Sequence, residues 1–338
     1  MSDAQPHAIV IGSGFGGLAA AIRLLAKNYR VTLLEQLDKV GGRAYVYEQD
    51  GFVFDAGPTI ITAPYLLEEL WQISGQRMED HLDLRPIDPF YTIRFDDGTV
   101  LNCVASVDGM RDEVRRIAPE DVEGYDRFIA ASKDIYAVAF SELADKPFHD
   151  FMSVIRAAPD LIRLKGYRSV FGLVSDYFTN EKLKIAFSFH PLLIGGNPLT
   201  TTAYYCLIAH LERLHLVHFA MGGTGAVVRG LANLITQQGG IIRLNAKVDQ
   251  IITEQNRVTG VRLADGEIIH ADLVISNADA ATTYNTLLKD YPRRRWTDSK
   301  LARAKYSMSL FVWYFGTNRR YDDVYHHMMV LGPRYQEL

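Results

Sequence analysis

The sequence predicts an α/β protein in which a Rossmann-like βαβ domain with a β-meander is interrupted by a mainly helical, partly mixed insertion. A short apolar strand at 8–11 leads into the glycine-rich residues 12–17 and then into apolar residues at helical spacing. Residues 108–220 have a mainly helical pattern, and short strands return after residue 240. We therefore expect one discontinuous domain over 1–85 and 220–280, and a second over 86–219 and 281–338.

The elements follow from apolar periodicity and turn residues. Leu18, Ile22 and Leu25 repeat at helical spacing after the first strand, and Gly239 ends a second helix. Asp-Gly pairs at 97–98 and 265–266 predict two hairpins. The expected helices are 58–75 and 225–238, and the expected strands are 8–11, 31–34, 91–95, 100–103, 241–244, 248–253, 258–263, 267–269 and 273–275.

Composition excludes several classes of protein. Hydrophobic residues make up 48% of the 338 residues and charged residues 22%, which is typical of a folded globular protein. The net charge of -4 gives no basic field, so no nucleic-acid partner is expected. The two cysteines and ten histidines match no disulfide framework or metal site, and no apolar run is long enough to span a membrane. A cytoplasmic location is the default.

The glycine-rich turn has the chemistry of a dinucleotide site. Gly12 permits the tight turn, Gly14 lets the backbone approach a pyrophosphate, and Gly17 lets the helix pack closely on the sheet. The helix N-terminus then offers unpaired N–H groups to the phosphates. Glu35 follows Gly17 by 18 residues, where a carboxylate accepts from a ribose hydroxyl and repels a 2′-phosphate. The alternative is a purely structural glycine turn.

The residues that follow distinguish flavin from nicotinamide. The strings V-I-G-S-G-F-G-G-L, L-L-E-Q, G-G-R-A at 41–44 and F-D-A-G-P-T at 54–59 resemble the flavoprotein superfamily of amine oxidases and carotenoid desaturases. This resemblance implies FAD, with the G-G-R residues at the phosphates, D-x-G-P near the flavin and the Val248 backbone at the adenine. A surface turn with a solvated Arg43 is the alternative. The expected cofactor-binding residues are Gly12, Gly14, Phe15, Gly16, Gly17, Glu35, Gln36, Gly42, Arg43, Gly57, Pro58, Thr59 and Val248.

Strings outside the cofactor region narrow the resemblance. D-P-F-Y at 88–91, F-S-F-H-P-L-L-I-G-G-N-P at 187–198, F-A-M-G-G-T-G-A at 219–226 and S-N-A-D at 276–279 are similar to bacterial phytoene desaturases. The resemblance implies desaturation of phytoene toward neurosporene or lycopene in carotenoid biosynthesis, with a hydride passing to the flavin. The alternatives are a carotenoid isomerase, a ketolase, a desaturase for a C30 substrate, an amine oxidase, or an isoprenoid-binding protein without redox chemistry.

The acid–base residue departs from the family pattern. Many bacterial relatives carry an Arg-Asp pair after a Pro-Phe dipeptide, whereas Met152-Ser153 stand at that place after Pro147-Phe148. Asp150 is the nearest carboxylate and our catalytic candidate, with a solvated surface Asp as the alternative. The apolar residues at 187–207 either line a substrate tunnel or form ordinary core.

An isoprenoid substrate also implies contact with a membrane surface. Residues 151–175 interleave Arg163, Lys165 and Arg168 with aromatic and aliphatic residues, and Pro159 predicts two short helices. We expect peripheral association with the inner face of the membrane, against a solvated helix face as the alternative. Relatives continue beyond residue 338, so the resemblance implies an incomplete second domain and weak flavin binding; the oligomeric state stays open.

Overall fold

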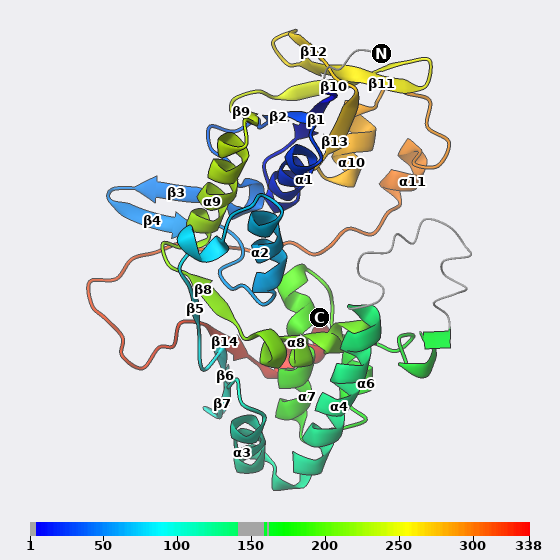
Figure 1. Ribbon diagram of the computed structural model, residues 1–338. Helices are drawn as coiled ribbons and strands as arrows, with labels where there is room; N and C mark the ends of the chain where they lie inside the picture. The colour runs from blue at the N-terminus through cyan, green and yellow to red at the C-terminus, as the bar shows by residue number, and fades with distance from the viewer. Residues whose placement is uncertain (1–4, 141–158, 161) are drawn as a thin grey trace. The chain divides into compact units, whose positions relative to one another are not determined.

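The computed structural model describes residues 5–140, 159–160 and 162–338 (Figure 1). The chain forms two compact units, Met1–Arg85 with Phe219–Lys305 and Pro86–His218 with Tyr306–Leu338. Residues 281–305 lie in the first unit, not in the second domain as expected. The reason is apolar packing, because Leu287 and Leu288 join the core that contains Ile251. No helix among the described residues is long and apolar enough to cross a membrane.

A four-stranded parallel sheet with the order β13-β1-β2-β9 is the centre of the first unit. Its strands are nearly continuous apolar runs because both faces are covered. Helices α1 and α9 lie on one side of the sheet and the antiparallel sheet β10-β11-β12 lies on the other (Figure 1). Ala8 and Val10 of β1 join the core with α1 and α9, whereas Ile9 and Ile11 join the core with β10 and β11. The bounds are β1(His7–Ile11), α1(Phe15–Ala26), β2(Arg30–Leu34), α9(Thr224–Gln237), β9(Ile241–Arg243), β10(Val248–Glu254), β11(Arg257–Leu263), β12(Ile268–His270) and β13(Leu273–Ser276).

The helix expected at 58–75 is shorter than the pattern predicted. It covers only α2(Pro64–Gln72), with Pro64 in its first turn, because hydrogen bonds to α9 hold the residues around Asp55 and Pro58 outside the helix. A hairpin that was not predicted precedes it. The remaining elements of this unit are η1(Gly42–Ala44), β3(Val46–Gln49), β4(Phe52–Asp55), η2(Met78–Asp80), α10(Ala280–Thr282), η6(Thr283–Leu287) and α11(Asp298–Ala302), while β5(Leu84–Pro86) and β8(His218–Ala220) contain the points where the chain changes unit.

The second unit joins a small sheet to several helices. The predicted hairpin at 91–103 is confirmed as β6(Tyr91–Phe95) and β7(Val100–Cys103), and β14(Met328–Leu331) adds a parallel strand that was not predicted. The helical pattern of residues 108–220 is present in its described part. The bounds are α3(Val107–Ile117), η3(Pro119–Asp121), α4(Val122–Ala139), α6(Val170–Val174), α7(Glu181–Ser188), η4(His190–Ile194), η5(Ala203–Leu207), α8(Ile208–His215) and η7(Pro333–Glu337).

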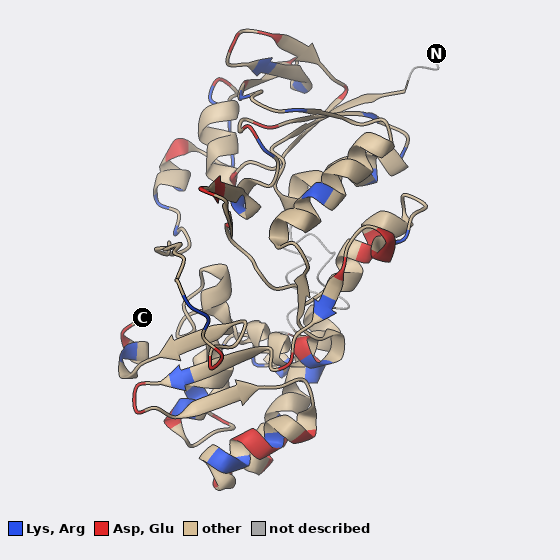
Figure 2. Cartoon of the chain, turned by 90° about the vertical axis from the view of Figure 1, so that its left-hand side faces the viewer, with Lys and Arg blue, Asp and Glu red and all other residues tan. Residues whose placement is uncertain are grey.

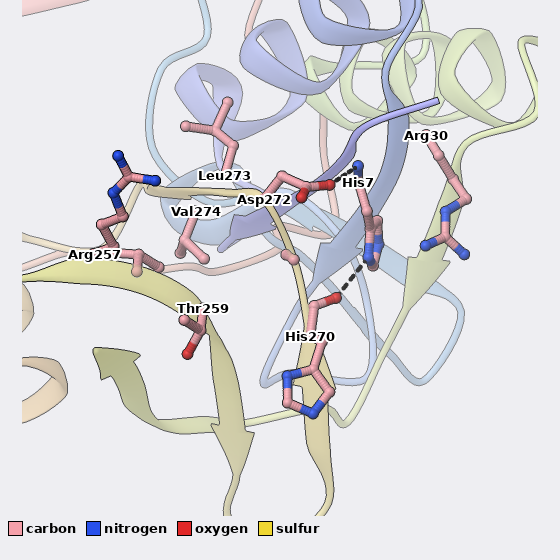
Figure 3. A pocket seen from close by; sticks show the side chains of 10 residues that line it. His7, Arg30, Arg257, Thr259, His270, Asp272, Leu273 and Val274 are labelled. Carbon is pink, nitrogen blue, oxygen red and sulfur yellow. Dashed lines mark hydrogen bonds between the residues drawn. The ribbon is translucent and has the colours of Figure 1, made fainter. Parts of the chain in front are cut away.

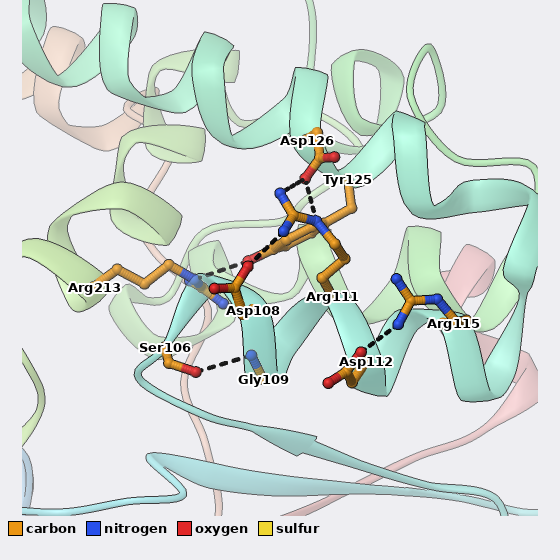
Figure 4. A network of polar contacts seen from close by, with 9 residues as sticks. All are labelled: Ser106, Asp108, Gly109, Arg111, Asp112, Arg115, Tyr125, Asp126 and Arg213. Carbon is orange, nitrogen blue, oxygen red and sulfur yellow. Dashed lines mark hydrogen bonds and ion pairs between the residues drawn. The ribbon is translucent and has the colours of Figure 1, made fainter.

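Helix α3 contains both acidic and basic residues (Figure 2). Ser106 caps its N-terminus by accepting from Gly109 N at 2.9 Å. Arg111 contacts both Asp108 and Asp126, the latter on α4 (Figure 4). These pairs are partly exposed and each contributes little. The network also reaches the core. Arg213 Nε donates to the hydroxyl of Tyr125 at 3.2 Å, and Tyr125 is fully buried.

Candidate cofactor site

The predicted phosphate-binding turn lies at the carboxyl end of β1. Gly12 has a φ of 89°, and its N–H donates to Leu34 O at 2.8 Å. Helix α1 begins directly after Gly14, with no side-chain cap and no acidic residue in its first turn. Its first N–H groups and the positive end of its dipole therefore suit an anion such as a pyrophosphate.

Gly14 and Gly17 of the turn lack a side chain for different structural reasons. A Cβ atom on Gly17 would lie 2.0 Å from Gly12 O, so any side chain there would push α1 off the turn. A Cβ atom on Gly14 would meet only the amide nitrogen of Asn277, at 3.1 Å. Gly17 is thus required by packing, whereas Gly14 leaves its backbone open to a ligand, which are the roles that the fingerprint predicts.

Two further glycine segments lie against this turn. A Cβ atom on Gly42 would lie 3.2 Å from the Cα of Gly14, and one on Gly57 would lie 2.2 Å from Arg43 O. Residues 41–43 therefore lie against the turn, and residues 55–58 lie against residues 41–43. The Arg43 side chain is exposed, and its guanidinium forms no hydrogen bond or ion pair with the described part of the chain. An exposed cation beside a helix N-terminus fits a phosphate.

Asp55 has a structural partner that the sequence did not reveal. Its two carboxylate oxygens accept from Thr224 N and Gly225 N, both at 3.1 Å, and so cap helix α9. The Thr224 hydroxyl donates to Pro58 O. Hydrogen bonds therefore join the segment around Asp55 to the glycine-rich start of α9, and Gly57 of this segment lies against the Arg43 backbone.

The predicted adenine end lies near Glu35. Ala246 N donates to Glu35 O at 2.7 Å, and Asn245 N donates to Leu37 O at 2.9 Å, which holds the start of β10 beside the end of β2. Val248 is buried two residues further on. Of the other predicted residues, Phe15 starts α1, Gly16 follows it, Gln36 is exposed after Glu35, and Thr59 follows Pro58. Asp150, the catalytic candidate, lies outside the described residues.

Sequence reasoning missed two residues at the turn. Ser13 is fully buried and contacts both Glu35 and Gly41. Asn277 follows β13, and its N–H donates to Ile11 O at 2.8 Å; a Cβ atom on Gly16 would lie 2.5 Å from its side-chain oxygen. A signal existed for Asn277, because ligands bind where strand order reverses, and the first polar residues after the strand at 273–275 lie beside that point.

A cavity at the amino ends of the parallel strands, opposite the cofactor turn, is not part of this site. It is lined by residues at the beginnings of β1, β2 and β13, among them His7 and Arg30. Figure 3 shows His7 fixed by hydrogen bonds to Asp272 and to the backbone of His270, at 2.8 Å each. Dinucleotides bind at the carboxyl ends of parallel strands, so this cavity lies away from the cofactor turn.

A buried polar cluster lies in the second unit. The Tyr91 hydroxyl donates to Glu212 Oε2 at 3.0 Å and lies 3.0 Å from His190 Nε2. Burial, followed by the charge of Glu212, raises the pKa of Tyr91 well above its usual value. Glu212 Oε1 is buried without a partner in the described residues. Tyr91 lies 99 residues before His190 and 121 residues before Glu212, so no local spacing pattern could have joined it to them.

The residues expected to line a tunnel or to form ordinary core include both buried and exposed side chains. Phe187 is buried and stacks on Phe178 with ring centroids 4.7 Å apart, and Phe189 contacts Tyr91. Leu193 and Ile194, which end η4, are exposed instead. Phe187 and Phe189 are therefore core residues of this unit.

We expect both thiols to be unreactive in the folded protein. Cys103 and Cys206 are free and buried, and burial raises the pKa of each thiol, to about 12 for Cys206. A buried thiol stays protonated at pH 8, and the thiolate is the reactive form. A thiol-specific dye at pH 8 should therefore label neither cysteine until denaturant is added. The free energy of unfolding should fall as the pH rises above about 8.5, because the unfolded thiols then lose protons that the folded ones keep. Rapid dye labelling of the folded protein would contradict the burial of the two thiols.

Comparison with known proteins identifies the family. A family model described as flavin-containing amine oxidoreductase matches residues 15–334. The chain belongs to this family. The predicted fold class, the flavin cofactor and the resemblance to flavin-dependent oxidoreductases are thereby confirmed. An oxidoreductase from Methanosarcina mazei has the same fold, with a TM-score of 0.59 at 18% identity over 88% of this chain and 64% of its own.

Curated relatives confirm the narrower resemblance. The chain is 44% identical to "Phytoene desaturase (neurosporene-forming)" of Cereibacter sphaeroides over 100% of this chain and 65% of the relative. It is 47% identical to "Phytoene desaturase (lycopene-forming)" of Pseudescherichia vulneris over 98% of this chain and 67% of that protein. The chain thus spans about two thirds of the length of these relatives.

Proposed function

We propose that this protein is an FAD-dependent desaturase that acts on phytoene and introduces C=C bonds toward neurosporene or lycopene. The supporting observation is the 43–47% identity, over nearly the whole chain, to relatives with those names. Relatives named for a C30 substrate, the 4,4'-diapophytoene desaturases of Methylomonas and Staphylococcus haemolyticus, are 29% and 31% identical. This difference favours the C40 substrate over the C30 alternative.

The residues at the turn have separable tasks in this proposal. The first N–H groups of α1 bind the pyrophosphate, Gly14 permits its close approach, and the Arg43 guanidinium adds a charge-assisted contact. Glu35 accepts from the adenosine ribose, and the Val248 backbone contacts the adenine. Residues 57–59 lie on the flavin side. When bound, FAD supplies the hydride acceptor, and the protein supplies orientation and exclusion of water.

The intact cofactor turn also disfavours a non-enzymatic isoprenoid carrier. A carrier without FAD has no need for a helix N-terminus kept uncapped beside an exposed arginine. Asp150 remains our proposed acid–base residue, and Asp150→Asn should lower desaturation while FAD stays bound.

Pigment analysis in a phytoene-producing host tests the proposal. Cells that express the protein should convert phytoene to neurosporene or lycopene, identified by absorption spectrum and mass, and cells with the Gly14→Val variant should accumulate phytoene. Geometrical isomers or keto-carotenoids without new C=C bonds would instead indicate an isomerase or a ketolase. Desaturation of a supplied C30 substrate alone would indicate that the relatives' C40 names do not transfer.

We also propose that the protein associates peripherally with the cytoplasmic face of a membrane through residues 151–175, of which the structure describes 159–160 and 162–175. Ile162 and Tyr167 are 68% and 76% exposed there, an arrangement suited to insertion between lipid headgroups. The neighbouring cations are partly neutralised within the chain, since Arg163 pairs with Asp160 and both Lys165 and Arg168 pair with Asp176. The apolar side chains should therefore contribute more to binding than charge alone.

Vesicle co-sedimentation separates the two contributions. Reversing Arg163, Lys165 and Arg168 to Glu should weaken binding to anionic vesicles in a salt-dependent manner and leave binding to neutral vesicles nearly unchanged. Tyr167→Ser should weaken binding to both kinds of vesicle, because it removes apolar area that would be buried among the lipid headgroups. A matched control reverses Arg30, Arg257 and Arg303, which have the same total charge and lie in the first unit. Equal losses in the test and control triples would show a general charge effect and no interfacial segment.

A further inference from the structure

Ser13 connects three segments of the cofactor site. It is the residue between Gly12 and Gly14, and its exposed fraction is 0%. Its N–H and its hydroxyl both donate to Glu35 Oε2, the former at 2.8 Å. Gly41 N lies 3.1 Å from Ser13 O and 3.2 Å from Ser13 Oγ. One small side chain thus ties the turn after β1 to the acid after β2 and to the loop that carries Arg43.

These contacts limit what Glu35 can still bind. A carboxylate oxygen has about two acceptor positions, and Ser13 fills both of those on Oε2. Oε1 accepts from Leu37 N at 2.9 Å, which leaves it one vacant acceptor position. Glu35 is only 3% exposed, so the carboxylate has little freedom to rotate toward a second ligand group. The buried charge depends on these donors, because an unpaired buried carboxylate is costly.

We propose that Ser13 is a positioning residue that orients Glu35 so that Oε1 alone accepts from one of the two adenosine ribose hydroxyls. The inference rests on the proposed FAD site and adds to it the manner of ribose recognition. It differs from a two-oxygen contact, in which the carboxylate would accept from both hydroxyls. Gly41 N also donates to the backbone oxygen of Ser13 at 3.1 Å, so Ser13→Ala keeps a hydrogen bond to the Arg43 loop.

Binding measurements on the wild-type protein distinguish a ribose contact through one carboxylate oxygen of Glu35 from a contact through both. FAD binding is measured by quenching of flavin fluorescence, and ADP, 2′-deoxy-ADP and 3′-deoxy-ADP compete for the site. We expect one deoxy analogue to bind about as well as ADP and the other to bind roughly tenfold more weakly, the effect of one hydrogen bond to a charged acceptor. Equal losses for both analogues, or for neither, would overturn the single-acceptor geometry whatever the variants do.

A double-mutant cycle tests the role of Ser13. Ser13→Ala should raise the Kd for FAD by roughly tenfold and reduce the preference among the ADP analogues to less than about threefold. In a Glu35→Gln background the same substitution should change the Kd by less than about twofold, because Ser13 acts through Glu35. Ser74→Ala, which removes another serine hydroxyl of the first unit, should change neither value.

The outcomes separate this inference from the proposed function. If Ser13→Ala binds FAD more weakly by the same factor in both backgrounds, Ser13 has only a structural role and the positioning role is refuted. If Ser13→Ala keeps the full preference for one ribose hydroxyl, the positioning role is refuted while the FAD site stands. A wild-type protein that binds neither FAD nor ADP would refute the cofactor site itself.

Discussion

Gly14→Val is expected to abolish FAD binding while the protein stays folded. Gly14 has φ -63° and ψ 170°, which a β-branched residue adopts without strain. A Cβ atom there approaches only the exposed amide of Asn277, which can move aside. The added side chain would instead occupy the path by which the pyrophosphate reaches the N–H groups of α1. We expect affinity to fall roughly 100-fold or more, from steric overlap and lost charge-assisted hydrogen bonds together.

Gly17→Ala is the matched comparison in the same turn. Its methyl group would lie 2.0 Å from Gly12 O, and no side chain can move to relieve that overlap. We expect this variant to lose thermal stability even without flavin, whereas Gly14→Val should unfold at nearly the wild-type temperature. The measurements are flavin content after purification and thermal unfolding of the flavin-free proteins. Full flavin occupancy in Gly14→Val would show that the pyrophosphate binds elsewhere.

The sequence predicted the parallel core and its glycine turn well because those features are local. The spacing of Gly12, Gly14 and Gly17 reports a turn and a helix start, and Ala8 to Ile11 form a continuous apolar strand that is buried on both faces. Register and neighbours then follow from the right-handed βαβ connection. The hairpin of β3 and β4 was missed despite its Asp50-Gly51 turn, at which both residues have positive φ.

Contacts between distant segments could not be derived from spacing. The carboxylate of Asp55 caps a helix that begins 169 residues later, and Ser13 reaches Glu35 and Gly41 through a single hydroxyl. A capping residue is recognisable when it precedes its helix directly, but here the cap comes from another strand. The resemblance to flavoproteins indicated that Asp55 lies near the cofactor, and the structure adds that its oxygens are engaged by α9.

A second large effect, on stability, is expected from substitution of Gly223, which lies against the carboxylate that caps α9. This residue precedes the helix with φ 75° and ψ -177°, a conformation open almost only to glycine. A Cβ atom on it would lie 1.8 Å from Asp55 Oδ2, and that carboxylate is held in place by Thr224 N and Gly225 N. Gly223→Ala should therefore lower the free energy of unfolding by roughly 3 kcal/mol or more, from backbone strain and the displaced cap together. Asp55→Ala alone should lower it by about 1–2 kcal/mol.

Combining the two substitutions separates strain from overlap. In Asp55→Ala the new methyl group at Gly223 no longer meets a carboxylate, so the double variant should be more stable than the sum of the single effects predicts, by about 1 kcal/mol. Backbone strain would remain in both backgrounds. Denaturant unfolding of all four proteins measures this coupling, and flavin content shows whether the Arg43 loop, which contacts Gly57, moves with the cap. Strict additivity would mean that the cost of Gly223→Ala is backbone strain alone, and that its methyl group does not disturb the Asp55 cap.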